Sequence, residues 1–208
     1  MSKLVLVRHG QAATFERNSD RLTPIGEQQA IALGEFFRSR GVSFDEIYSG
    51  TFERHTRTAE LAGLDKFHSM PEFNEYDAPG ILRSAGHTEP AKDNRELQSR
   101  FDALMPRWIA GTLEATGVES FADFRARVQG GLRKLIEADR GSRRVIVFTS
   151  GGPIGVAVQT VVGAKEPMAL ELNWRIRNCS LTEFLFTRNR ISLDSFNATP
   201  HLAEVTFR

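Results

Sequence analysis

The segment that most constrains the fold is Leu4–Val7, a run of four apolar residues that ends abruptly at Arg8, His9 and Gly10. A short, continuous apolar run is typical of a strand buried on both faces, as in the parallel sheets of α/β proteins. In open sheets of this kind, ligand sites lie at the carboxyl ends of the strands. The polar residues that follow this strand are therefore candidates for a functional site.

These residues have properties suited to phosphoryl chemistry. Neutral imidazole is nucleophilic near pH 7, since its unperturbed pKa is about 6.5, so His9 is a candidate nucleophile. The guanidinium of Arg8 is always charged, and its fork of N–H groups matches phosphate oxygens. Gly10 has no Cβ, so we expect a ligand to approach its backbone closely. Taken alone, three such residues more commonly form a turn than a phosphoryl-transfer site. Further residues along the chain are needed to distinguish the two.

Composition excludes several classes of function. The length of 208 residues, with 40% hydrophobic and 25% charged residues, suits one globular domain with a sizeable core. The 27 basic and 26 acidic residues nearly cancel, so no overall charge favours nucleic acid or a membrane surface as a partner. A single cysteine, Cys179, excludes an intrachain disulfide and a cysteine-rich zinc site. No apolar run reaches about 18 residues and no signal peptide is evident, so we expect a cytoplasmic protein.

Strand and helix patterns alternate along most of the chain. Further strands are expected at 44–49, 66–70 and 144–150, a hairpin at 180–187 and 190–196, and helices from Thr23, after Gly50, from Ser120 and over 155–162. This alternation predicts an α/β protein, a three-layer α/β/α sandwich with a mainly parallel sheet and an antiparallel edge. We expect one domain over 1–208 with a helical insertion at about 78–119 over the site. The insertion would hold a loop over 78–90 and a helix over about 91–116, kinked or divided at Pro106.

Two more strand ends carry groups suited to anions. Arg54 opens a helix after the second strand, and a helix N-terminus already favours anions. It would add a second phosphate-binding arm, although an exposed charged face is the commoner fate of such a residue. After the 144–150 strand, the backbone N–H groups of Ser150, Gly151 and Gly152 are placed to cradle an oxyanion. This stretch is not a nucleophile elbow, because Phe148 stands where that motif has a glycine.

A carboxylic acid is the remaining requirement, because the leaving alkoxide of a phosphate ester needs a proton. Glu72, Glu75 and Asp77 all follow the third strand. Their spacing alone does not separate them.

Together these residues resemble the histidine phosphatase superfamily, also called phosphoglycerate mutase-like. The resemblance covers most of the chain and rests on several motifs in the order of the family. They are Leu6–Gln11, Leu22–Gly26 with Gln29-Ala30, Tyr48-Ser49 with Arg54 and Thr58-Ala59, Phe73–Glu75, Val145–Phe148 before Gly151-Gly152, and Asn178–Thr182.

The resemblance implies a phosphatase that hydrolyses a phosphomonoester or phosphohistidine, on a small molecule or a phosphoprotein, with no metal and no cofactor. His9 would carry a phosphohistidine intermediate, and Arg8 and Arg54 would hold the phosphoryl oxygens. Glu75 matches the acid position of the family, so it would protonate the leaving group and then activate water. The expected substrate-binding set is Arg8, Gly10, Gln11, Thr23, Arg54, Ser150 and Gly151, with helix capping a sufficient role for Thr23.

Position 150 departs from the family pattern. The family has a second histidine there that helps to bind the transferring phosphoryl group, and Gly155 stands where the family has an arginine. Serine brings no positive charge, and loss of one transition-state donor costs on the order of 10²–10³ in rate, so we expect a slow phosphatase. The candidates to compensate are His55, Arg57 and His87, each expected at the surface. His68 and His201 are expected to be structural or exposed.

Other functions remain open at this point. A catalytically weak protein of the same fold that binds phosphorylated ligands would use the same phosphate site. A mutase fits less well, because by resemblance mutases keep the second histidine and have a longer insertion. A serine hydrolase built on Ser150 is the most remote alternative. The phosphatase is favoured because His9, both arginines and Glu75 are all present.

Overall fold

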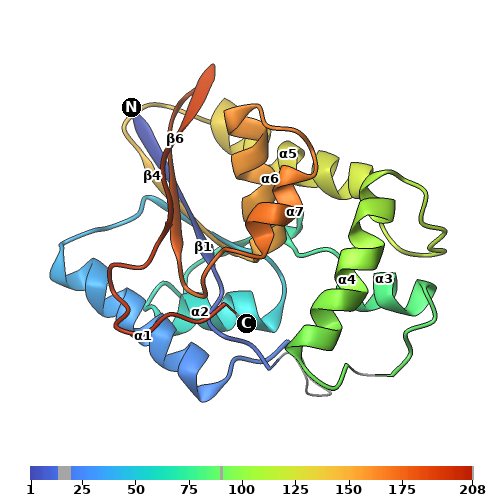
Figure 1. Cartoon of the computed structure of the whole chain (residues 1–208). Coiled ribbons are helices and arrows are strands. Elements are labelled where there is room, and N and C mark those ends of the chain that lie inside the picture. The colour runs from blue at the N-terminus through green and yellow to red at the C-terminus, as the bar shows by residue number, and fades with distance from the viewer. Residues whose placement is uncertain (14–19, 90, 208) are drawn as a thin grey trace. The chain divides into compact units, whose positions relative to one another are not determined.

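The computed structural model describes residues 1–13, 20–89 and 91–207 of the chain (Figure 1). The chain divides into two compact units. The first unit comprises Met1–Glu75 and Val128–Arg208, and the second comprises Tyr76–Arg127. The second unit contains the predicted insertion at 78–119 and extends beyond it at both ends of the sequence range. That the insertion covers the site remains a prediction.

The first unit is built on a six-stranded mixed sheet with the strand order β3-β2-β4-β1-β5-β6 among the described residues. The strands are β1 (Ser2–Arg8), β2 (Glu46–Ser49), β3 (His68–Ser69), β4 (Arg144–Thr149), β5 (Leu181–Thr187) and β6 (Arg190–Ala198). β1 pairs with β4, β4 with β2 and β2 with β3 in parallel, while β5 and β6 form the antiparallel edge. The predicted α/β class and mixed sheet are confirmed.

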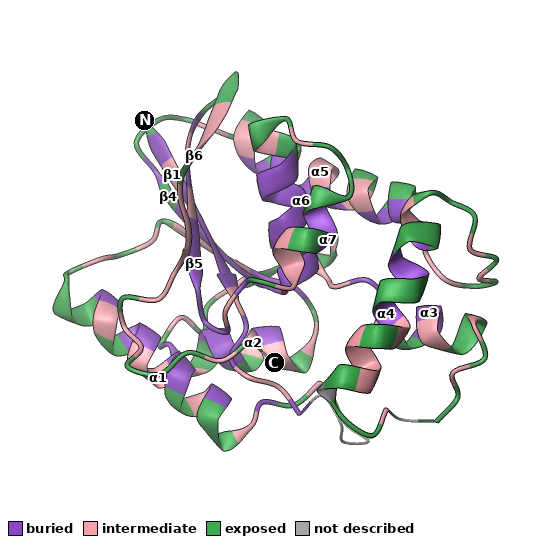
Figure 2. Ribbon diagram, viewed as in Figure 1, coloured by how far each residue is buried: buried purple, intermediate pink, exposed green. Residues whose placement is uncertain are grey.

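Helices lie on both sides of this sheet (Figure 1). α1 (Pro24–Ser39) and α2 (Glu53–Leu61) cover one face, and α6 (Gly151–Val162) lies on the other. Figure 2 shows the buried residues concentrated in the central strands and in α6. The core under α1 and α2 joins apolar side chains of both layers: Val5, Val7, Leu33, Phe37, Ala59, Ala62, Ile146, Phe148 and Leu181. Burial on both faces explains why β1 and β4 are nearly continuous apolar runs.

The second unit has an aromatic core of its own. The ring of Trp108 lies 4.9 Å from Tyr76 and 5.2 Å from Phe121 between centroids, and its indole N–H donates to the carbonyl of Glu119 at 3.0 Å. The helices here are α3 (Ala78–Ser84), α4 (Asn94–Ile109) and the first part of α5 (Phe121–Glu137), which continues into the first unit. Of all the helices described, none is long and apolar enough to cross a membrane.

Three predicted elements were wrong in type or extent. Residues 78–84 form a helix rather than a loop, because Asp77 caps it and Pro79 sits in the first turn, where proline is tolerated. α4 covers Asn94–Ile109 and not 91–116, and Pro106 does not divide it. α6 begins at Gly151 and not at 155, and the short helix α7 (Met168–Asn173) was not predicted.

Candidate active site

The carboxyl ends of the four parallel strands meet at one edge of the sheet, as the strand order requires. His9 follows β1, and its backbone N–H donates to the carbonyl of Thr149, the last residue of β4, at 2.9 Å. On the other side, the carbonyl of His9 accepts from the backbone N–H of Cys179 at 3.2 Å. Gly50, after β2, donates to the carbonyl of Phe148 at 2.9 Å. The backbone of the candidate nucleophile is therefore fixed between β4 and the segment that enters β5.

The His9 side chain is buried, with 6% of its surface exposed. Its Nδ1 atom lies 2.7 Å from the carbonyl oxygen of Gly10. Because a carbonyl only accepts, Nδ1 carries the proton and Nε2 carries the lone pair. Burial, followed by the charges of Arg54 and Arg8 and the neighbouring His55, holds the pKa of His9 well below 6.5, while the bond to Gly10 acts in the opposite direction. The imidazole is neutral near pH 7, which is the nucleophilic form.

Both predicted arginines act electrostatically on His9. The Arg54 guanidinium pairs with the Asp20 carboxylate at 2.7 Å and lies 4.5 Å over the ring of Phe52. The Arg8 guanidinium donates to the backbone carbonyls of Ile176 and, at 2.7 Å, of Phe207. The charges of two guanidiniums therefore act on one imidazole, although Arg54 lies 45 positions after His9 in the chain.

The three competing carboxylates lie in different surroundings. Glu75 accepts a hydrogen bond from the backbone N–H of Gly152, in the first turn of α6, at 3.1 Å. Glu72 pairs with Lys134, and Asp77 caps α3 in the second unit by accepting from the N–H of Gly80 at 2.8 Å. Glu75 is therefore the carboxylate that contacts the helix after β4, next to Ser150.

Asn74 fixes the segment that carries Glu75 to the turn after β2. Its side-chain oxygen accepts from the backbone N–H of Thr51, and its side-chain NH₂ donates to the hydroxyl of Thr51, both at 2.7 Å. The two hydrogen bonds join the turn before Arg54 to the residue before Glu75. The segment that carries Glu75 is therefore attached to the turn that precedes Arg54.

Ser150 and His55 form a contact that the sequence analysis missed. The Nε2 atom of His55 lies 2.6 Å from Oγ of Ser150, and both residues are fully buried. The expectation that His55 lies at the surface was wrong. Its spacing with Thr58 and Ala59 (i, i+3, i+4) was the available signal, because these three residues form the buried face of α2. Burial and the charge of Arg54 hold the pKa of His55 well below 6.5.

Gly10 packs closely against α1. An ideal Cβ there would lie 2.4 Å from the carbonyl oxygen of Gly26 in α1, and its N–H donates to the Thr58 hydroxyl at 3.1 Å. Its lack of a side chain therefore admits the helix, and the approach of a ligand to its backbone stays a prediction. Thr23 caps α1 as predicted, accepting from the N–H of Gly26 at 3.1 Å, and its hydroxyl lies 2.9 Å from Oε1 of Gln11. These contacts attach the loop after His9 to α1.

The remaining candidates lie in different surroundings. Gly151 is buried, and an ideal Cβ there would lie 2.1 Å from Oδ1 of Asn173. Arg57 is exposed on α2 and pairs with Glu27 at 3.4 Å. His87 belongs to the second unit. His201 lies 5.7 Å from the ring of Phe36, and burial lowers its pKa to about 4.

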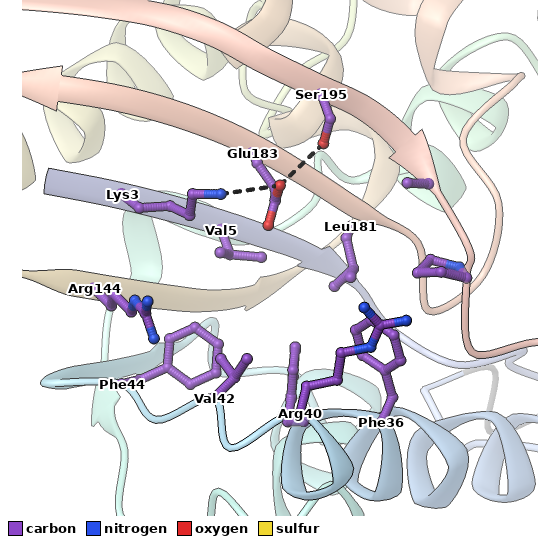
Figure 3. Close-up of a pocket in the computed structure, with 13 residues that line it drawn as sticks. Lys3, Val5, Phe36, Arg40, Val42, Phe44, Arg144, Leu181, Glu183 and Ser195 are labelled. Atoms are coloured by element: carbon purple, nitrogen blue, oxygen red, sulfur yellow. Dashed lines mark hydrogen bonds and ion pairs between the residues drawn. The ribbon is translucent and has the colours of Figure 1, made fainter. Parts of the chain in front are cut away.

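A pocket of about 270 Å³ lies between α1 and the sheet, apart from these residues (Figure 3). Its wall is mainly apolar, with Phe36, Phe44 and Leu181, and Lys3 and Ser195 both contact the Glu183 carboxylate at 3.3 Å. None of the predicted catalytic residues lines it. Across 1–13, 20–89 and 91–207, no group of three or more His, Cys, Asp or Glu side chains is arranged to hold a metal ion.

Comparison with known proteins identifies the family of this chain. The family model of the histidine phosphatase superfamily (branch 1) matches residues 4–199. A "Probable phosphoglycerate mutase GpmB" of Salmonella choleraesuis is 31% identical over 195 residues, which cover 88% of this chain and 84% of that protein.

Solved structures of low sequence identity share the fold. A phosphoserine phosphatase variant from Entamoeba histolytica, in complex with phosphoserine, has a TM-score of 0.72 at 22% identity and covers 97% of this chain and 100% of its own. The alpha-ribazole phosphatase from Shigella flexneri has a TM-score of 0.69 at 21% identity, covering 95% and 96%. A phosphoglycerate mutase from Bacillus anthracis has a TM-score of 0.66 at 17% identity, covering 96% and 94%.

Proposed function

The chain belongs to the histidine phosphatase superfamily (branch 1), and from this premise we propose that it is a phosphatase that forms a phosphohistidine on His9. The substrate class we assign is a small molecule that carries a phosphomonoester. A phosphoprotein with a phosphomonoester or a phosphohistidine would offer the same phosphoryl group. Relatives named for phosphoserine and alpha-ribazole support this choice. The Salmonella relative named as a mutase shares the phosphoryl-transfer chemistry.

One observation carries the proposal. The imidazole of His9 is buried, its proton is placed on Nδ1 by the Gly10 carbonyl, and the charges of Arg54 and Arg8 act on it. A neutral imidazole with its Nε2 lone pair beside two guanidiniums is what attack on an anionic phosphorus centre requires.

The proposed reaction proceeds in two steps. First, the Nε2 lone pair of His9 forms a bond to phosphorus while the bond from phosphorus to the leaving oxygen breaks. Glu75 gives a proton to that oxygen, and Arg8 and Arg54 stabilise the charge on the other phosphoryl oxygens. Second, Glu75 takes a proton from water, the water oxygen bonds to phosphorus, and the P–N bond breaks to regenerate neutral His9.

Trapping the intermediate tests this proposal. Brief mixing with a phosphorylated substrate, followed by denaturation, should leave phosphate on the protein that is stable to base and labile to acid. His9→Ala should leave none and should hydrolyse no substrate. Phosphate-dependent thermal stabilisation of the wild type, with no turnover above His9→Ala, would replace the phosphatase with a phospholigand-binding protein. Transfer of the phosphoryl group to a second position of phosphoglycerate, instead of to water, would indicate a mutase.

The Ser150–His55 contact favours one other candidate, a serine hydrolase. A nucleophile needs a base within hydrogen-bond reach and a third group that orients the base. The 2.6 Å contact places an imidazole within reach of Ser150, but among the residues that the structure describes Nδ1 of His55 has no hydrogen-bond partner, and it faces Gly50. This candidate ranks below the phosphatase for that reason. Carboxylic ester cleavage that is lost in Ser150→Ala and kept in His9→Ala would reverse the ranking.

A further inference from the structure

The Ser150–His55 hydrogen bond joins two segments that are 95 residues apart in the chain. Ser150 stands between β4 and α6, next to Thr149, whose carbonyl accepts the backbone N–H of His9. His55 stands on the first turn of α2, next to Arg54. The rings of His9 and His55 are 5.7 Å apart between centroids. The pair therefore lies beside the proposed nucleophile.

The placement of the protons follows from the surroundings of the His55 ring. An ideal Cβ on Gly50 would lie 2.3 Å from Nδ1, and Nδ1 makes no hydrogen bond to any part of the chain that the structure describes. A buried N–H without an acceptor is rarer and less favourable than a buried lone pair without a donor. The proton therefore belongs on Nε2, which donates to Oγ of Ser150. The Ser150 hydroxyl accepts this bond, so its own O–H remains available to donate a hydrogen bond to another acceptor.

Packing alone does not account for the pair. A buried imidazole with one unpartnered nitrogen lowers stability compared with an apolar side chain of similar size. At a helix N-cap, a serine hydroxyl ordinarily accepts from the backbone N–H groups of the first turn. Ser150 is the N-cap of α6, yet its side chain makes no such bond and contacts His55 instead. An apolar side chain at position 55 and an N-capping hydrogen bond accepted by the Ser150 hydroxyl would each be the more stable local arrangement.

We infer that the Ser150 hydroxyl donates a hydrogen bond to an oxygen of the transferring phosphoryl group and that His55 positions and polarises this hydroxyl. The pair would take the place of the second histidine that the family resemblance expects at position 150. In a chain of hydrogen bonds, each donor strengthens the next, so Nε2–H of His55 makes the Ser150 hydroxyl a stronger donor. This inference rests on the proposed function, because it needs a phosphoryl group at His9.

The test uses single, double and exchanged variants of the full chain. The variants are Ser150→Ala, His55→Ala, His55→Gln, the double His55→Ala/Ser150→Ala and the exchange His55→Ala/Ser150→His. Arg57→Ala, on the exposed face of the same helix, is the matched control, and His9→Ala is the blank. The readouts are the kcat and KM of p-nitrophenyl phosphate hydrolysis, inhibition by orthovanadate, and the melting temperature of each variant.

We expect Ser150→Ala and His55→Ala each to lower kcat by about 10²- to 10³-fold with a smaller change in KM, since the donor acts on the transition state. The double variant should be no slower than the slower single variant, because the two residues act as one unit. His55→Gln keeps a side-chain N–H and should be faster than His55→Ala. The exchange, which returns an imidazole to the same space, should recover at least part of the activity.

Several outcomes would overturn the inference while leaving the phosphatase intact: a folded Ser150→Ala or His55→Ala with wild-type kcat, or losses that multiply in the double variant. If His55→Ala fails to fold, Ser150→Ala and His55→Gln decide in the same way. If the wild type shows no turnover above His9→Ala, the proposed function fails, and stabilisation by orthovanadate carries the test. Stabilisation weakened in Ser150→Ala and His55→Gln, but not in Arg57→Ala, then supports the pair; equal stabilisation in all of them overturns it.

Discussion

Asp20 and Arg54 form an ion pair with a separation of 2.7 Å at the N-terminus of α2. The same carboxylate accepts from the backbone N–H of Glu53 at 2.8 Å, so it occupies the position where a helix favours an anion. A phosphoryl group held by Arg54 would meet this negative charge. Asp20 therefore has two opposed effects in the proposed reaction: it fixes the guanidinium and it repels the substrate.

Asp20→Asn separates these two effects. The amide keeps an oxygen for the α2 amides but removes the charge. Coulomb repulsion between partly exposed groups is worth about 1 kcal/mol, so we expect inhibition by inorganic phosphate to strengthen about fivefold at low salt. The inhibition constant measured at low and high salt checks this. Weaker inhibition would mean that positioning of Arg54 outweighs repulsion.

The contact between Gly10 and Gly26 predicts a clash on substitution. In Gly10→Ala, the new Cβ would meet a backbone oxygen at 2.4 Å, and backbone atoms cannot move aside as a flexible side chain can. We expect a loss of about 1–3 kcal/mol in the free energy of unfolding, as is usual for overpacking. Urea denaturation measures it. Gly130→Ala is the matched control, because an ideal Cβ there meets nothing within 4 Å and alanine favours the α5 helix by about 0.5–1 kcal/mol. Equal stability of the two variants would contradict the packing account.

The parts of the fold that were predicted are those with strong local signals. β1 and β4 were predicted from their apolar runs, and α1 from its threonine cap and first-turn proline, which the structure confirms. The parallel strands place Arg8 and His9 at the carboxyl end of β1 and Arg54 after β2, and the charges of both arginines act on His9. A shared phosphate site of these three residues stays a prediction. Three-dimensional contacts without a local signal were missed. The pairing of His55 with Ser150, and the approach of Gly26 to Gly10, each depend on segments that meet only in the folded chain.

Three histidines with lowered pKa values predict how stability depends on pH. Burial holds the pKa of His9 and His55 below the ordinary value of about 6.5 and lowers the pKa of His201 to about 4. As the pH falls below 6.5, the unfolded chain takes up protons that the folded protein does not. The free energy of unfolding should therefore fall with falling pH, by up to about 1.4 kcal/mol per pH unit for each histidine, and change little above pH 7.5.

Urea denaturation between pH 7.5 and pH 5 measures this slope. His55→Gln should lower the slope by the share of one histidine, because the replacement does not titrate. His68→Ala, at an exposed position of β3, is the control and should keep the slope of the wild type. A slope in His55→Gln equal to that of the wild type would show that His55 does not remain neutral in the folded protein.

The proposed acid, Glu75, predicts a dependence on the leaving group. Glu75→Gln keeps an oxygen to accept from the N–H of Gly152 but cannot supply a proton. An alkyl phosphate such as phosphoserine needs protonation of its leaving oxygen, so its hydrolysis should slow by about 10²–10⁴. p-Nitrophenolate leaves without a proton, so formation of the phosphohistidine from p-nitrophenyl phosphate should slow far less in rapid-mixing experiments. Glu72→Gln, which removes the charge that pairs with Lys134, is the matched control and should keep both rates. Equal slowing of both substrates by Glu75→Gln would assign the carboxylate to positioning, and the proton of the first step would have to come from another group.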